Sequence, residues 1–432
     1  FTGAKQRGSQ RRLSKNPVHS GTTRIEQNET YQARVSKTNK MYTAATQSDS
    51  PMTFALTEEQ VLIQETVREM AQAEFAPKAA EVDQKHRFPR ENFELLASSD
   101  LCGLPFPEKY GGAGMDNVSY AIVVEELAKA CATTSVIYSA HVSLCAKPIY
   151  IFGTEEQKEK FLVPLCQGKK LGAFALSEPG SGSDAAAAKC TAVRKGDHYI
   201  LNGSKNWITN GIEADYYLVI AQTDASLKHK GLIALIVEKG TPGFTFGKLE
   251  DKLGIKGSST CQINFEDSPV PVANMLAGPQ DGFKVSMVTL DGGRIGIAAQ
   301  AVGIAQGAWD HAFKYSKERI AFNQTINKFQ AIQFMLAEMQ TEIDAARLLT
   351  FNAARGQDLG VKITKEAAHA KLFAAEVAMR STVKCVQIFG GYGYVTDYPA
   401  ERYMRDAKIT EIYEGTSEVQ RLVIAQNVLK GL

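Results

Sequence analysis

The chain has 432 residues, of which 44% are hydrophobic and 22% charged, a composition typical of soluble globular proteins with two or three domains. Its net charge of +2 argues against a nucleic-acid binder that depends on phosphate contacts. No apolar run reaches the length of about 18 residues that suggests a transmembrane helix. The seven cysteines and seven histidines are scattered without metal-ligand spacing, so we expect reduced core thiols and no metal site.

Residues 1–51 differ from the rest of the chain. They hold nine basic and three acidic residues, a net charge of +6, and few large apolar side chains. Such a segment buries too little surface to fold alone. We interpret it as a disordered basic leader or extension, resembling a transit peptide in composition but lacking a clear amphipathic stripe. An extension added for expression is an equal alternative, and Met52 is a natural start for the folded part.

Residues 52–170 read as an N-terminal helical domain. Thr57-Glu-Glu-Gln60 has the pattern of a capping box, in which the Thr and Gln side chains satisfy free amides at a helix start. Periodic apolar residues follow it, with breaks at Pro- and Gly-containing stretches. Further helices are expected at about 91–99, 116–131, 135–152 and 154–166.

The apolar period then changes twice. Short β-rich runs separated by turn signals fill residues 171–282, as expected of a middle β domain built as a small barrel or sandwich. Residues 283–432 return to the helical period in four long segments joined by short loops, which predicts an antiparallel four-helix bundle. The expected segments are 283–317, 328–356, 363–389 and 416–430. The fold class is therefore mainly α with a central β domain.

One stretch near the C-terminus combines a carboxylate with a glycine turn. Glu414 precedes Gly415, and Thr416 then offers a hydroxyl cap for a helix whose apolar residues share one face. The acid therefore lies just outside a positive helix N-terminus, where glycine lets the backbone approach a ligand closely. A carboxylate in this place is either a capping acid or a general base, and the local pattern leaves both readings open.

Two other stretches suit a planar or anionic ligand. Ala175-Leu-Ser-Glu-Pro-Gly-Ser-Gly-Ser-Asp184 follows an apolar strand with a loop rich in backbone donors, which is either a ligand cradle or a plain surface turn. Asn206-Trp-Ile-Thr-Asn210 places one of two tryptophans between polar neighbours. That Trp is either a core residue or a flat wall for a planar cofactor.

Together with Ile412-Tyr-Glu-Gly-Thr416, these stretches resemble the acyl-CoA dehydrogenase family across residues 54–430. Leu290-Asp-Gly-Gly-Arg294, Arg319-Ile-Ala-Phe322 and Gln387-Ile-Phe-Gly-Gly391 occur in the order and spacing of that family. Ile409-Thr-Glu-Ile-Tyr-Glu-Gly-Thr-Ser-Glu418 and Leu253-Gly-Ile-Lys-Gly-Ser-Ser-Thr260 are most similar to short-chain (butyryl-CoA) members.

The resemblance implies roles for individual residues. Glu414 matches the base that removes the α-proton of an acyl-CoA thioester while a hydride passes from the β-carbon to flavin N5. Its backbone N–H matches a donor to the thioester carbonyl. FAD contacts are implied for Leu176, Ser177, Trp207, Thr209, Arg319, Phe322, Gln330, Gln387, Gly391 and Thr416, of which Arg319, Phe322, Gln330, Gln387 and Gly391 match positions that serve a neighbouring subunit's cofactor. Substrate contacts are implied for Ser183, Asp291, Arg294, Tyr413 and Gly415.

The implied activity is FAD-dependent α,β-dehydrogenation of a short-chain acyl-CoA to the trans-2-enoyl-CoA. The implied partners are an electron-transferring flavoprotein and other copies of the chain in a homotetramer, a dimer of dimers. The implied location is the mitochondrial matrix or the bacterial cytoplasm. Alternatives are an acyl-CoA oxidase reoxidised by dioxygen, a branched-chain acyl-CoA dehydrogenase, and a non-catalytic family member that acts as a scaffold.

The sequence departs from the family pattern in two places. Asn323 and Thr325 stand where many members have glycine and proline, although Asn tolerates the left-handed backbone that such a turn needs. Lys147 lies in the helix that resembles the family's pocket-lining helix, where a small or neutral residue is common. We expect Lys147 to face solvent; an inward orientation would narrow the pocket or favour a polar acyl tail.

Overall fold

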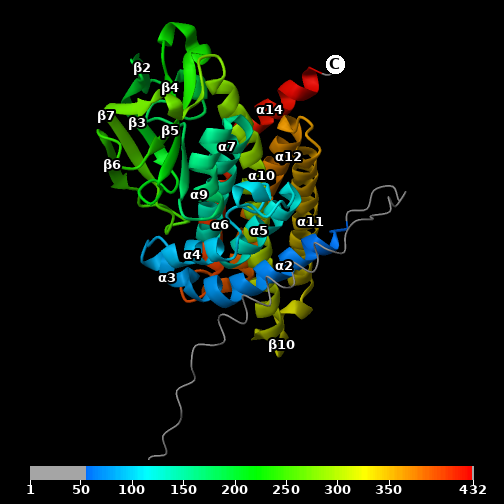
Figure 1. Ribbon diagram of the computed structural model, residues 1–432. Helices are drawn as coiled ribbons and strands as arrows, with labels where there is room; N and C mark the ends of the chain where they lie inside the picture. The colour runs from blue at the N-terminus through cyan, green and yellow to red at the C-terminus, as the bar shows by residue number, and fades with distance from the viewer. Residues whose placement is uncertain (1–54, 431–432) are drawn as a thin grey trace, which may run out of the picture. The chain divides into compact units, whose positions relative to one another are not determined.

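The computed structural model describes residues 55–430 (Figure 1). The prediction of a disordered leader over residues 1–51 therefore concerns residues outside the described range. The described part folds as helices, then a sheet, then helices, which confirms the predicted fold class. The proposed domain boundaries near residues 170 and 282 stay predictions.

The first helices are positioned by local caps and buried apolar faces. The capping box at Thr57 is formed: its Oγ1 accepts from Gln60 N at 3.2 Å, and its N–H donates to Gln60 Oε1 at 3.0 Å. Helix α5 is buried along almost its whole length, so it is a central helix of this segment. A π-helical stretch, Ala140–Ala146, joins α6 to α7 and packs against the sheet through β1. The helices are α2 (Glu58–Met70), α3 (Ala79–Gln84), α4 (Arg90–Ser98), α5 (Asn117–Ala130), α6 (Ala132–Ser139), α7 (Lys147–Phe152), α8 (Glu155–Gln157) and α9 (Val163–Cys166).

The middle segment forms an eight-stranded mixed sheet. Its strand path is β6-β7-β3-β2-β4-β5-β8, and β1 pairs with β4 in parallel. Every residue of β4 is buried, as expected of a central strand covered on both faces. The strands are β1 (Gly172–Ala175), β2 (Thr191–Lys195), β3 (His198–Ile208), β4 (Tyr216–Gln222), β5 (Leu232–Glu238), β6 (Phe244–Leu249), β7 (Cys261–Pro271) and β8 (Met275–Ala277).

The C-terminal segment is built around one long helix, α10, which packs on α5, α11 and α12. A two-stranded hairpin follows α10, and the short helix α13 precedes the turn that contains Glu414. Helix α13 was not predicted from the sequence, because its nine residues are few and rich in charge. The elements are α10 (Gly282–Glu318), β9 (Ile320–Ala321), β10 (Gln324–Thr325), α11 (Gln330–Asp358), α12 (Thr364–Phe389), α13 (Ala400–Lys408) and α14 (Ser417–Leu429).

A single hydrophobic cluster includes residues from all three segments, so the sheet and both sets of helices share one core. All seven cysteines are buried and free of disulfides, which agrees with the expectation of reduced core thiols. Among residues 55–430, no helix combines the length and the apolar character needed to cross a membrane.

Candidate active site

The turn before α14 has an unusual backbone. Glu414 has φ = 52° and Gly415 has φ = 91°, so two consecutive residues adopt the left-handed region. For Gly415 this conformation is easy, whereas for a glutamate it costs about 1–2 kcal/mol. Such strain persists where surrounding groups determine the backbone, and it often marks functional sites.

Three side chains fix this turn. Thr416 caps α14, and its Oγ1 accepts from Val419 N at 3.3 Å, which confirms the predicted cap. The Gln420 amide donates to the carbonyls of Glu414 and Gly415 at 3.1 and 2.9 Å. Lys371, on α12, donates to the Gly415 carbonyl at 2.7 Å. Hydrogen bonds therefore connect the turn to α12 and to α14.

The Glu414 carboxyl lies against α10. A methyl group at Gly293 would come within 2.0 Å of Glu414 Oε2 and 2.6 Å of Leu144 Cδ2, so the carboxyl occupies the space beside a glycine. The residue as a whole is half-buried, but its Oε2 is buried and has no hydrogen-bond partner among the described residues.

Burial controls the ionisation of this carboxyl. It raises the pKa of Glu414 to about 8, because the charged form loses its hydration. The positive charges of Lys371 and Arg294 act in the opposite direction. A carboxyl that is shielded from solvent and has a pKa near neutral pH has the properties of a general base.

Asp291 and Arg294 lie one turn apart on α10. Arg294 is buried and donates to Asp291 Oδ1 at 2.6 Å, and Thr364 donates to Asp291 Oδ2 at 2.6 Å. The Arg294 Nε is buried without a partner, so it retains an unused donor. Of the other residues implied to contact substrate, Ser183 is exposed on the loop after β1. The Tyr413 hydroxyl donates to the Gln300 side chain.

Four of the residues implied to contact FAD gather at the ends of β1 and β3: Leu176, Ser177, Trp207 and Thr209. The backbone N–H of Asn206 donates to the Ser177 carbonyl at 2.8 Å and joins the two strand ends. Trp207 is 61% exposed with φ = 61°, so the reading of this residue as a core tryptophan is wrong.

A buried ion pair supports these strand ends. Lys205, which is fully buried, donates to Glu178 Oε1 at 2.7 Å and to Leu176 O at 3.0 Å. The Glu178 carboxylate also accepts from the backbone amides of Lys189 and Cys190, at 2.7 and 2.9 Å. The pair thus fixes the backbone beside the exposed tryptophan.

The residues at this edge fit a flavin. An exposed indole offers a flat face, and the Asn206 Oδ1 nearby is buried with no partner among the described residues. An unsatisfied buried acceptor beside an exposed aromatic surface suits a planar group that carries hydrogen-bond donors.

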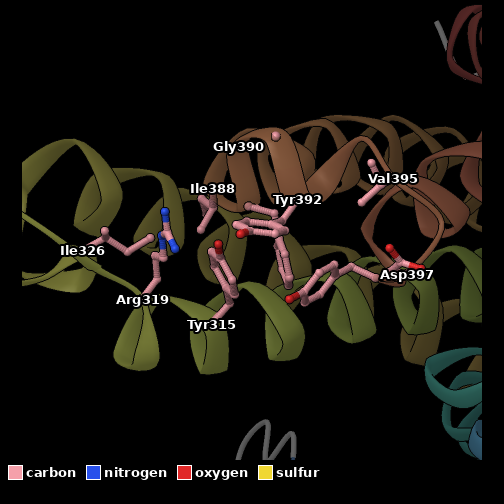
Figure 2. A pocket seen from close by; sticks show the side chains of 11 residues that line it. Tyr315, Arg319, Ile326, Ile388, Gly390, Tyr392, Val395 and Asp397 are labelled. Carbon is pink, nitrogen blue, oxygen red and sulfur yellow. The ribbon is translucent and has the colours of Figure 1, made fainter.

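Thr416 lies at the start of α14, beside Glu414, and the remaining five implied FAD residues lie at the far end of α10. Arg319 and Gly391 line a cavity of about 910 Å³, in which Tyr315 and Tyr392 lie between Arg319 and Asp397 (Figure 2). The Arg319 guanidinium is 5.4 Å from the centroid of the Tyr392 ring. Phe322, Gln330 and Gln387 are exposed. Further lining residues are Ile326, Ile388, Phe389, Gly390, Val395 and Tyr398.

The turn that carries Glu414 and the cavity beside Arg319 are far apart in one chain. Gly293 touches Glu414 near the start of α10, and Arg319 follows its end, 26 residues later. At 1.5 Å per residue this corresponds to about 39 Å along the helix. The Glu414 turn and the Arg319 cavity therefore lie at well-separated places along α10.

The two departures from the family pattern have different outcomes. Phe322 and Asn323, with φ of 50° and 61°, form the two-residue turn between β9 and β10, so Asn323 does adopt the left-handed backbone. Thr325 lies in β10. Lys147 is partly buried and donates to Asn117 Oδ1 at 3.1 Å, so the expectation that it faces solvent is wrong. Burial also lowers its pKa.

Sequence reasoning missed three residues of the site: Gly293, Lys371 and Gln420. Lys371 had a detectable signal, since it interrupts the apolar register of α12 at a position flanked by Ala367 and Ala374, both buried. Gly293 belongs to the Leu290-Asp-Gly-Gly-Arg294 motif, but no neighbouring residue in the sequence indicates that it faces Glu414. That contact joins residues 121 positions apart and exists only in the fold.

Three family models match the chain in order. They describe the N-terminal domain (residues 57–169), the middle domain (173–268) and the C-terminal domain (280–429) of acyl-CoA dehydrogenases. A curated relative, the short-chain specific acyl-CoA dehydrogenase of Clostridium acetobutylicum, is 54% identical over 88% of this chain and 100% of its own length.

Solved structures agree with these matches. Butyryl-CoA dehydrogenase from Megasphaera elsdenii has a TM-score of 0.86 and 51% identity, covering 88% of this chain and 100% of that one. A chain from the structure described as the electron transferring flavoprotein of Acidaminococcus fermentans has a TM-score of 0.87 and 54% identity, with coverage of 88% and 100%.

Proposed function

Because the chain belongs to the acyl-CoA dehydrogenase family, we propose that it dehydrogenates a short-chain acyl-CoA thioester with Glu414 as the base. The enzyme class is an oxidoreductase and its cofactor is FAD. The product is the trans-2-enoyl-CoA. The preference for a short acyl chain is supported by the short-chain relative and by the likeness to butyryl-CoA dehydrogenase.

The observation that carries this proposal is the environment of the Glu414 carboxyl. It is unpaired at Oε2 and has a pKa raised to about 8 by burial, so its carboxylate form, which predominates above about pH 8, is a stronger base than an ordinary glutamate. An α-proton is a weak acid, and the thioester carbonyl must be stabilised as the proton leaves. The Glu414 backbone N–H is free of the helix that follows, because this residue precedes the cap, and we assign it as the donor to that carbonyl.

FAD, when bound, supplies the acceptor for the hydride that leaves the β-carbon. Leu176, Ser177, Trp207, Thr209 and Thr416 would hold its ring system, and Arg319, Phe322, Gln330, Gln387 and Gly391 would hold the remainder in a neighbouring copy. Gly293, which adjoins Glu414, and Arg319 are about 39 Å apart along α10, and this separation supports an active site shared by two subunits. We also propose a homotetramer, as the family resemblance implies, with an electron-transferring flavoprotein as the electron acceptor.

We assign substrate binding to the part of α10 that adjoins Glu414. Ser183, Asp291 and Arg294 would contact the CoA moiety, while Tyr413 and Gly415 border the acyl group beside the base. Arg294 has a buried, unpaired Nε, which leaves a donor available for a ligand. The mitochondrial or bacterial location stays a prediction.

The test is anaerobic reduction of the purified FAD-containing protein by butyryl-CoA, followed as loss of oxidised-flavin absorbance. Glu414→Gln should retain flavin and CoA binding but reduce its flavin at least about 100-fold more slowly, because general-base removal typically costs that much. Glu411→Gln is the matched control, since Glu411 lies three residues earlier and pairs with Lys408 at 2.6 Å. Full activity in Glu414→Gln would refute the assignment of the base.

Other outcomes identify the alternatives. Rapid reoxidation of the reduced enzyme–product complex in air would indicate an oxidase, and a higher kcat/KM for branched acyl-CoAs would indicate a branched-chain enzyme. A flavin-free preparation that resists reconstitution with FAD would indicate a scaffold.

A further inference from the structure

Lys371 is a buried cation that the proposed reaction does not use. Its side chain is 0% exposed on α12, among alanines that include Ala367 and Ala374. It forms no ion pair within 4.0 Å with any described residue, and its ammonium donates to a neutral acceptor, the Gly415 carbonyl, at 2.7 Å. A charged lysine in such a place is costly unless its interactions compensate. These interactions are directed at the turn that carries Glu414.

The contact reaches a turn with an unusual backbone. Glu414 has a positive φ of 52°, which a glutamate adopts only when its surroundings impose it. The Gly415 carbonyl accepts from both Lys371 and Gln420, while the Glu414 carbonyl accepts from Gln420 alone. Lys371 therefore provides the link from α12 to the turn, and Gln420 provides the link from α14.

The charge of Lys371 also acts on Glu414. Burial lowers the pKa of Lys371 to about 8, and its attraction to Glu414 opposes that shift. Arg294, Glu411 and Glu418 are the other charged groups that act on Lys371. On the side of Glu414, Arg294 is the second cation, and Tyr413 and Tyr120 are neighbouring neutral groups.

We propose that Lys371 is a positioning residue for the base: it holds the Gly415 carbonyl, so that the Glu414 turn keeps its left-handed backbone, and it provides a positive charge that favours the ionised carboxylate. This inference rests on the proposed function of Glu414. It adds a role for a residue on another helix, which acts through Glu414 and not on the substrate.

Lys371→Met tests both parts, because methionine fills similar space without the charge or the donor. Lys365→Met is the matched control, since Lys365 lies on the same helix with an exposed side chain. In Lys371→Met, amide hydrogen exchange within residues 410–421 should become about 10-fold faster, because a charge-assisted hydrogen bond is lost. The acid limb of the kcat/KM profile should move up by about one pH unit, because loss of a nearby cation raises the pKa of the base.

A purely structural role for Lys371 would lower stability and flavin content but leave the acid limb in place. An unchanged acid limb together with unchanged exchange in residues 410–421 overturns the proposal. If Lys371→Met does not accumulate as folded protein, Lys371→Gln, which also lacks the charge, is measured for the same shift of the acid limb. The proposed function fails on a different result, which is that butyryl-CoA does not reduce the flavin of the wild type. In that case the exchange measurement still decides whether Lys371 holds the Glu414 turn.

Discussion

Replacing Gly293 by alanine should displace the proposed base by a calculable amount. The new methyl carbon would lie 2.0 Å from Glu414 Oε2, whereas ordinary contacts begin at 3.4 Å, so the carboxyl must retreat by about 1.4 Å, the difference between these distances. A misplacement of about 1 Å at a reacting group costs on the order of 100-fold in rate. We therefore expect Gly293→Ala to reduce its flavin with butyryl-CoA about 100-fold more slowly than the wild type.

Gly292→Ala is the matched control, because its methyl carbon would meet only the flexible end of Gln357, at 3.3 Å. Both substitutions gain about 1 kcal/mol of helix propensity, and only Gly293→Ala offsets this gain with overpacking of about 1–3 kcal/mol. Gly292→Ala should keep its rate within about threefold of the wild type. The assay is stopped-flow anaerobic reduction, with flavin content measured for each variant. A Gly293→Ala rate equal to that of Gly292→Ala would refute the placement of the carboxyl against α10.

Three further predictions concern stability. Glu414→Gln should raise the melting temperature, and the increase should grow from pH 5 to pH 8. The folded-state pKa of Glu414 is raised to about 8, so the wild type loses stability as pH rises through that window, whereas the glutamine variant does not. An equal melting difference at all pH values would contradict this. Lys205→Met should lower the free energy of unfolding by about 3 kcal/mol in urea titrations, because Glu178 is left buried and unpaired, whereas Lys195→Met, on the exposed end of β2, should not. Thr57→Ala should destabilise the start of α2 by about 1 kcal/mol, seen as faster amide exchange in its first turn, with Thr66→Ala as a control in the same helix; equal exchange in both would exclude the capping box as its source.

Periodicity and turn chemistry predicted most of the architecture. The capping box at Thr57, the cap at Thr416 and the long helix from about residue 283 are local features, and local interactions form them in the fold. The short helix α13 was not predicted, because its nine residues hold too few apolar positions to define a helical period.

The site was predictable in part. The position of Glu414 beside Gly415 and a helix start followed from adjacent residues. Its raised pKa comes from burial of the carboxyl beside Gly293 of α10, which only tertiary packing produces. Lys147 shows the same limit. A long charged side chain suggested a solvent-facing lysine, but its partner Asn117 lies 30 residues away, at the start of α5.

The cysteines give the fold a set of internal reporters. Four of the seven lie in the N-terminal segment, two in the middle segment and one on α12, and all are buried. Burial raises the pKa of Cys102, Cys145 and Cys385 above the ordinary value for a thiol, which suppresses the reactive thiolate. A thiol reagent should thus modify each cysteine only when its own segment opens. Peptide mapping of the modified sites with time would rank the local stability of the three segments in the unmutated protein.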